Sequence, residues 1–115
     1  VILTILCKLS DIPEGSGKGF ELETVEGTTE YFVVRKGNKV YAYENSCPHT
    51  SAPLDWIKDR FIDKDSGHIL CATHGALFRI ENGLCMAGPC VGDSLNPINV
   101  KVEGVDIVIE DLYNL

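Results

Sequence analysis

Apolar and polar residues alternate along residues 98–110, and this period of two constrains the fold more than any other feature of the sequence. One side of the alternation carries Ile98, Val100, Val102, Val105, Ile107 and Ile109. The other side carries Asn99, Lys101, Asp106, Val108 and Glu110. Because successive side chains of a strand point to opposite faces of a sheet, we expect two strands here that bury the first set and expose the second.

Turn-forming pairs separate the other strand-like runs. Gly37-Asn38 stands between EYFVVRK and KVYAYEN, Asn82-Gly83 follows ALFRI, and Glu103-Gly104 divides the two C-terminal strands. Pairs of this kind favour the positive φ angles that tight hairpins need. The sequence therefore predicts an antiparallel, all-β domain of many short strands, with one helical turn within 53–61 and little other helix.

The composition limits the partners and the compartment of the chain. With 17 acidic and 10 basic residues, the formal net charge is -7, which disfavours nucleic acid and anionic lipid. The apolar N-terminal segment VILTILCKL is much shorter than the ~20 residues of a membrane span, and we recognise no signal peptide. Five cysteines, an odd number, argue against a fully paired secreted scaffold. We therefore expect one cytoplasmic domain that binds neither nucleic acid nor membrane.

Two short motifs each combine a cysteine with a histidine. Cys47-x-His49 lies in one irregular segment, and Cys71-x2-His74 begins 22 residues after His49 in another. Structural zinc sites usually join like with like, C-x2–4-C followed by H-x3–5-H, whereas each pair here is mixed. A two-iron cluster can use the mixture if both cysteines bind one iron and both histidines bind the other. We therefore favour an iron–sulfur site and keep a zinc-stabilised binding module as a rival hypothesis.

These motifs resemble those of Rieske-type [2Fe-2S] ferredoxins. The resemblance is carried by CPHTSAPL, CATHGALF and ENGLCMAGPC, and it covers the chain from about Tyr31 to the end. It implies a Rieske-like, antiparallel three-sheet sandwich with two cluster-binding loops, and a third loop at Gly88-Pro89 that shields the cluster. The single domain would occupy residues 1–115, with the cluster-binding part at about 45–92 and a β-structured base formed by the rest.

The resemblance also implies the ligand set. One [2Fe-2S] cluster would be bound by Cys47 and Cys71 at the inner iron, and by His49 and His74 at the outer iron, where electrons would leave. Neutral imidazoles in place of two thiolates make the cluster less negative, which raises its reduction potential above that of all-cysteine clusters.

Two residues beyond the second motif bear on the potential. High-potential respiratory members of the family carry a serine and a tyrosine two and four residues after the last ligand, and both hydroxyls donate hydrogen bonds; this chain has Ala76 and Phe78 there. Those members also tie the two loops with a disulfide, at places that correspond here to Ala52 and Ala76. We therefore expect a centre at about −150 mV, the low end of the Rieske range.

The function implied by the resemblance is electron transport. The chain would carry one electron from a flavin-dependent reductase to a terminal oxygenase, would be no enzyme itself, and would dock through its acidic surface against basic patches of its partners. A second hypothesis is a small subunit of a reductase complex, similar to that of assimilatory nitrite reductase. A third, a fragment of a Rieske oxygenase, would need a 2-His-1-carboxylate iron site and a catalytic domain for which residues 1–115 leave no room.

Other candidate residues receive a structural interpretation. Cys85 and Cys90 are predicted to be free thiols beneath the loops, with a disulfide between them as the alternative, and Cys7 is predicted to be a core residue. Four aspartates stand among lysine and arginine residues, so we expect a solvated face rather than acid–base pairs; they are Asp55, Asp59, Asp63 and Asp65.

Overall fold

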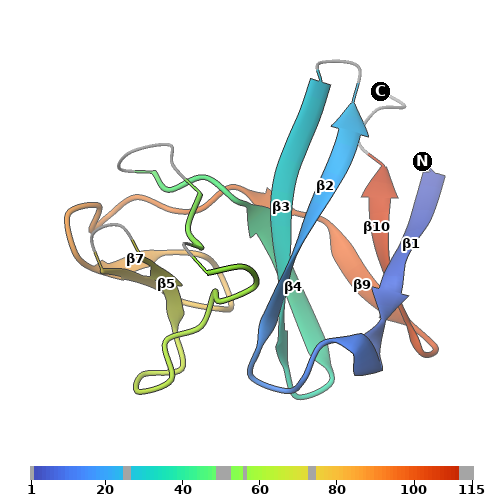
Figure 1. Cartoon of the computed structure of the whole chain (residues 1–115), viewed down its shortest axis with the longest axis horizontal. Coiled ribbons are helices and arrows are strands. Elements are labelled where there is room, and N and C mark those ends of the chain that lie inside the picture. The colour runs from blue at the N-terminus through green and yellow to red at the C-terminus, as the bar shows by residue number, and fades with distance from the viewer. Residues whose placement is uncertain (1, 25–26, 49–52, 56, 73–74, 112–115) are drawn as a thin grey trace.

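Three antiparallel sheets make up the part of the chain that the computed structural model describes, residues 2–24, 27–48, 53–55, 57–72 and 75–111 (Figure 1). The first sheet has the strand order β1 (Ile2–Lys8), β10 (Asp106–Asp111), β9 (Val100–Glu103). The central sheet has the order β2 (Gly17–Thr24), β3 (Gly27–Lys36), β4 (Lys39–Glu44), β8 (Pro97–Ile98). The third sheet has the order β5 (Ile69–Cys71), β6 (Ala76–Phe78), β7 (Cys85–Ala87). The predicted all-β, three-sheet fold is confirmed.

Strand β3 connects the interiors on both sides of the central sheet. Tyr31, Phe32, Val33 and Val34 are all buried, although successive side chains of a strand point to opposite faces. Tyr31 and Val33 belong to the same apolar cluster as Ile107 of the first sheet, whereas Phe32 and Val34 belong to a second cluster. A strand that is buried on both faces has a continuous apolar sequence, and the run YFVV is an example.

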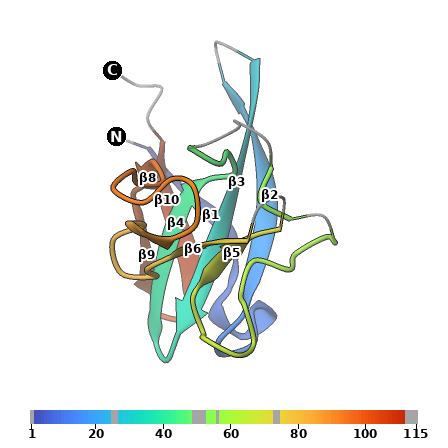
Figure 2. The same cartoon turned by 90° about the vertical axis from the view of Figure 1, so that its left-hand side faces the viewer.

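The two apolar clusters fill the spaces on either side of the central sheet. The base cluster, toward the first sheet, contains Ile12, Tyr31, Val33, Ala42, Ile107 and Ile109. The loop cluster, toward the third sheet, contains Phe32, Val34, Tyr43, Cys47, Leu54, Phe61, Ile69, Cys71, Ala76, Phe78, Ile80, Cys85, Cys90 and Leu95. Figure 2 views the molecule from the side of the third sheet, with β5 and β6 in front of β3 and β4. The cysteines of both motifs therefore lie in the loop cluster.

Two of the three predicted turns are confirmed, the third is shifted by one residue, and the predicted strand at 98–102 is divided between two sheets. The pairs at 37–38 and 82–83 lie at connections between consecutive strands, as expected, whereas the third turn is Gly104-Val105 because Glu103 still belongs to β9 and pairs with Asp106. Strand β8 pairs with β4, whereas β9 pairs with β10. The chain crosses between the sheets at Asn99, whose carbonyl accepts a hydrogen bond from the Glu110 N–H at 3.0 Å. Alternation alone does not reveal that the hydrogen-bonding partner changes.

The predicted faces of the last hairpin are wrong at two valines. Val105 was expected to be buried, but it follows the turn residue Gly104 and is 67% exposed. Val108 was expected to be exposed, but it is only 4% exposed. Val108 lies in the middle strand of its sheet, with Ile5 of β1 and Lys101 of β9 as direct neighbours. Val108 is buried because the longer side chains of these two neighbours cover it from both sides.

The helical turn predicted within 53–61 does not form in the described residues of that segment, 53–55 and 57–61. Asp59 has φ of 66°, which a right-handed helix cannot accommodate, and its N–H donates to the Asp55 side chain at 3.2 Å. The Arg60 N–H donates to the Ile57 carbonyl at 3.0 Å, which closes a turn instead. Helix in the described ranges is limited to the 3-10 turn η1 (Leu9–Asp11), and none there has the length and apolar character needed to cross a membrane.

Candidate functional site

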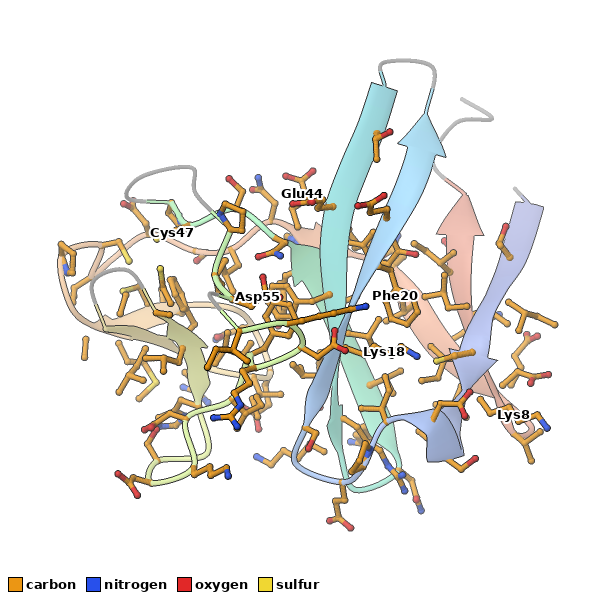
Figure 3. The ribbon with its side chains drawn as sticks, in the orientation of Figure 1. Lys8, Lys18, Phe20, Glu44, Cys47 and Asp55 are labelled. Atoms are coloured by element: carbon orange, nitrogen blue, oxygen red, sulfur yellow. The ribbon has the colours of Figure 1, made fainter. Side chains whose placement is uncertain are left out.

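The two motif cysteines are buried together at one end of the molecule. Cys47 is 1% exposed and Cys71 is fully buried, and both belong to the loop cluster. Figure 3 shows Cys47 at the end opposite Lys8, away from the first sheet. His49 and His74 lie outside the described residues, as does Ala52. The structure therefore brings the two cysteine ligand candidates into one cluster and leaves the histidine assignment a prediction.

Asn45 closes the base of the first loop, which carries Cys47. Its side-chain carbonyl accepts a hydrogen bond from the Leu54 N–H at 2.7 Å, and its amide group donates to the Asp55 carboxylate at 2.9 Å. The backbone N–H of Asn45 donates to the Glu30 carbonyl at 2.9 Å, which attaches the same residue to β3. The Asn45 side chain therefore joins both ends of the loop, and its backbone N–H fixes them to the central sheet.

The second loop joins β5 to β6 and is attached to the first loop. Cys71 pairs with Ala76 across the two strands, so residues 72–75 form the connection. The Gly75 N–H donates to the Cys71 carbonyl at 2.9 Å, and Gly75 has φ of 71°, a conformation that glycine adopts without strain. The Ala72 N–H donates to the Leu54 carbonyl at 3.0 Å. This bond holds the segment beside Cys71 against the end of the first loop.

The third loop begins in close contact with the start of β6, directly after the second loop. Gly88 has φ of 99°, and a Cβ atom at this position would lie 2.8 Å from the Ala76 Cα atom. Because real Cβ atoms do not approach backbone so closely, only glycine fits here. The third loop therefore begins beside the strand that follows the second motif, and its role in shielding a cluster stays a prediction.

The positions that carry hydroxyl groups in high-potential members are apolar and buried here. Ala76 and Phe78 are both fully buried in β6, and Phe78 pairs with Cys85 of β7. Neither side chain can donate a hydrogen bond to a neighbouring sulfur.

The cysteines outside the two motifs behave largely as predicted. Cys85 and Cys90 are each 2% exposed and are free thiols, so the alternative of a disulfide is not realised. Burial, and next the hydrogen bond to Cys85, raise the pKa of the Cys90 thiol, which keeps it protonated at neutral pH. Cys7 is half-buried on β1 and packs against the base cluster, and burial followed by the nearby Asp11 raises the pKa of its thiol.

The described donors fit an iron–sulfur centre. Thiolates are the ligands that iron–sulfur clusters use, and two buried sulfurs come here from two loops joined by a backbone hydrogen bond. The Asn45 and Ala72 contacts set the spacing of the loops without help from the cysteines. A site preorganised in this way can hold a cluster that needs one ligand pair from each loop.

Sequence reasoning missed the residues that support the first loop. Asp55 and Asp59 were expected on a solvated face, but both are only half-exposed and act as acceptors for specific donors. The Asp59 carboxylate accepts the Gly19 N–H at 2.8 Å, and the Asp55 carboxylate accepts from Asn45 and from the Asp59 N–H. The solvated-face interpretation is wrong for these two residues, because their carboxylates accept hydrogen bonds from the backbone N–H groups of Gly19 and Asp59 and from the Asn45 side-chain amide.

Comparison with known proteins identifies one family. The profile of the family described as Rieske [2Fe-2S] domain matches residues 3–102. The ferredoxin of carbazole 1,9a-dioxygenase from Nocardioides aromaticivorans IC177 has a similar structure, with a TM-score of 0.74 and 30% identity over 95% of this chain and 97% of that one.

Two further comparisons concern a sequence relative and the fold. The ferredoxin component of the alkene monooxygenase system of Xanthobacter autotrophicus is 25% identical over 105 residues, which cover 91% of this chain and 72% of the relative. A structure described as the small subunit of a nitrite reductase has a TM-score of 0.68 at 16% identity and covers 96% of this chain and 100% of its own. At that identity the likeness concerns the fold alone.

Proposed function

The chain belongs to the Rieske [2Fe-2S] domain family, whose cofactor is a Rieske-type [2Fe-2S] cluster, and on that premise we propose that it is a one-electron carrier between a reductase and a terminal oxygenase. The observation that carries the proposal is the match to the carbazole 1,9a-dioxygenase ferredoxin, which extends over 97% of that carrier. The alkene monooxygenase ferredoxin component supports the same role. The chain itself would be no enzyme.

The proposed ligands are Cys47 and Cys71 for one iron, and His49 and His74 for the other. The burial of both cysteines in the loop cluster supports the first pair. The second pair rests on the motif spacing, one histidine two residues after Cys47 and one three residues after Cys71. The cluster, when bound, accepts and releases a single electron, while Asn45, Ala72 and Gly75 hold the loops at a fixed spacing.

Visible and EPR spectra of the purified protein before and after dithionite reduction test the proposal. A Rieske-type centre gives a coloured oxidised protein and an EPR signal on reduction, with two irons and two sulfides per chain. A colourless, EPR-silent protein with stoichiometric zinc would instead support the rival zinc module. A carrier would also purify apart from its partners, whereas co-purification in a fixed ratio with a reductase would favour the subunit hypothesis.

The reduction potential is expected at about −150 mV, and adding hydroxyl groups should raise it. Ala76→Ser and Phe78→Tyr each place a donor beside the second loop, and ~1–2 kcal/mol of preferential stabilisation of the reduced state corresponds to a rise of roughly 40–90 mV. Redox titration followed by EPR measures the change. Ala42→Ser, at a buried alanine of the base cluster, is the matched control and should leave the potential unchanged. A wild-type potential well above zero would contradict the expectation.

We propose that the partner proteins carry basic patches and that these patches dock against an acidic hollow of this chain, beside the first loop. The hollow has a volume of about 320 Å³, and its lining includes Glu21, Glu30, Asn45, Asp55, Lys58 and Asp59. Glu21 and Glu30 are exposed direct neighbours across β2 and β3, an arrangement that costs free energy because like charges repel. A cationic side chain of a partner would relieve that repulsion.

Neutralising this acidic pair should slow electron transfer to a basic acceptor. We expect Glu21→Gln/Glu30→Gln to lower the second-order rate of cytochrome c reduction about three-fold or more at low salt, and to weaken its salt dependence. Stopped-flow absorbance measures the rate. Glu14→Gln/Glu103→Gln removes the same charge from exposed residues that do not line the hollow and should change the rate less. Equal rates for both double variants would contradict docking at the hollow.

We also propose a cytoplasmic location. The free thiols of Cys7, Cys85 and Cys90, which lie outside the proposed ligand set, support it, because such thiols persist in a reducing compartment.

A further inference from the structure

Cys85 and Cys90 place two thiols in near-bonding geometry beside the site. Their Sγ atoms are 2.9 Å apart, whereas a disulfide bond measures about 2.04 Å. A relative movement of roughly 0.9 Å would therefore bring the two sulfurs to bonding distance. In the proposed ligand set neither of these cysteines binds the cluster, so both sulfurs remain available for other chemistry.

Backbone hydrogen bonds already hold the two cysteines in position. The Cys85 N–H donates to the Asp93 carbonyl at 2.8 Å, and the Asp93 N–H donates to the Cys90 carbonyl at 2.9 Å. Asp93 therefore connects the start of β7 to the third loop, which leaves β7 at the left of Figure 1. Forming a disulfide closes a ring of residues 85–90, which normally costs conformational entropy. Because the folded backbone already holds these residues in place, little of that cost remains.

The two thiols are buried within a segment whose other residues are largely exposed. Each cysteine is 2% exposed, yet Met86 and Val91, which follow them directly in the sequence, are 45% and 64% exposed. Gly88 and Pro89 between them are exposed as well. Local opening of this exposed segment would therefore give a small oxidant access to the sulfurs.

We propose that Cys85 and Cys90 form a reversible disulfide, a redox modification site within the third loop, and that hydrogen peroxide is the oxidant. The Cys85 sulfur is first oxidised to a sulfenic acid, with release of one water. The second thiol sulfur then displaces the hydroxyl group as a second water and forms the S–S bond. Two thiols and one peroxide thus give one disulfide and two waters, and a dithiol reductant restores both thiols by exchange.

The disulfide would fix the segment that contacts the start of β6, directly after the second loop. Gly88 lies between the two cysteines, and it is the residue seated against Ala76. The third loop can move away from the second loop only if the segment 85–90 moves. A disulfide between its two ends restricts that movement. We therefore expect the oxidised form to release iron more slowly than the thiol form. This effect rests on the proposed function, whereas the disulfide itself does not.

The test treats the purified holoprotein with a small excess of hydrogen peroxide, removes the peroxide with catalase, and alkylates all remaining thiols under denaturing conditions. Mass spectrometry is expected to find two alkyl groups fewer in most chains, a peptide cross-link between Cys85 and Cys90, and recovery of both thiols after dithiothreitol. Cys85→Ser and Cys90→Ser should each abolish the cross-link, and Cys7→Ser, at a half-buried cysteine of the base, should retain it.

A wild type without the cross-link, or one in which Cys47 or Cys71 is cross-linked in preference, would overturn the proposal. Iron release to a chelator, followed by visible absorbance, is expected to be roughly two-fold slower or more in the oxidised wild type, with no such difference in Cys90→Ser. Equal release rates would overturn the stabilising effect. The outcome is independent of the carrier role, because a chain that fails the spectroscopic test can still form the cross-link.

Discussion

Cys47→Ala, Cys71→Ala, His49→Ala and His74→Ala are each expected to yield protein without bound iron, a fall from two iron atoms per chain to almost none. Each variant removes one of four ligands, and the open position exposes the cluster to water and loss of iron. Iron and sulfide analysis, together with visible absorbance after purification without oxygen, measures the loss.

Cys85→Ala is the matched control for the two cysteine variants. Cys47 and Cys85 are both almost fully buried and both belong to the loop cluster. Each Cys→Ala substitution removes one sulfur atom, so the two variants lose the same side-chain volume. If Cys47 acts as a ligand rather than only as a packed side chain, Cys47→Ala should lose its iron while Cys85→Ala keeps it. Loss of iron in Cys85→Ala together with its retention in Cys71→Ala would contradict the ligand assignment.

Phe61→Ala is expected to cause the largest loss of stability among single substitutions outside the ligands, about 3–5 kcal/mol. The Phe61 ring is fully buried and stacks on Phe32, with ring centroids 4.4 Å apart and an angle of 8° between the planes. Gly17 and Gly19 of β2 lie beside it, and a Cβ atom on either would contact the Phe61 side chain at 3.3 Å and 3.5 Å. Removing the ring leaves a cavity between the central sheet and the loops that this structure cannot easily close.

Thermal unfolding of the holoprotein at a fixed scan rate, followed by circular dichroism, measures this effect. A loss of that size lowers the midpoint by more than ~10 °C for a chain of this length. Ile57→Ala, at a side chain that is 59% exposed, should lower it by only a few degrees. Similar midpoints for the two variants would mean that the Phe61 ring does not support the loops as the structure indicates.

The fold and the two cysteines of the site could be predicted from the sequence because short-range patterns encode them. Alternation of period two and turn pairs such as Gly37-Asn38 mark strands and hairpins directly. The mixed Cys-x-His and Cys-x2-His motifs restrict the metal chemistry through ligand type and spacing alone. The structure then placed Cys47 and Cys71 in one buried cluster, as that chemistry requires.

Other features could not be predicted, because they depend on which strand lies beside which. Val108 is buried by its neighbours on two other strands, and alternation within one strand does not contain that information. Asn45 and Asp55 look like ordinary polar loop residues in the sequence, yet their hydrogen bonds close the first loop. The distance between Cys85 and Cys90 likewise depends on the Asp93 backbone contacts, which no spacing rule specifies.

The double-sided burial of β3 has a consequence for how the molecule opens. Its residues 31–34 supply side chains alternately to the base cluster and to the loop cluster, so neither cluster can separate from the central sheet without exposing apolar surface of the same strand. Amide hydrogens of β3 should then exchange with solvent only through unfolding of the whole chain. The cluster-binding part at about 45–92 and the β-structured base would form one cooperative unit, and neither half would persist as a stable fragment after cleavage between them.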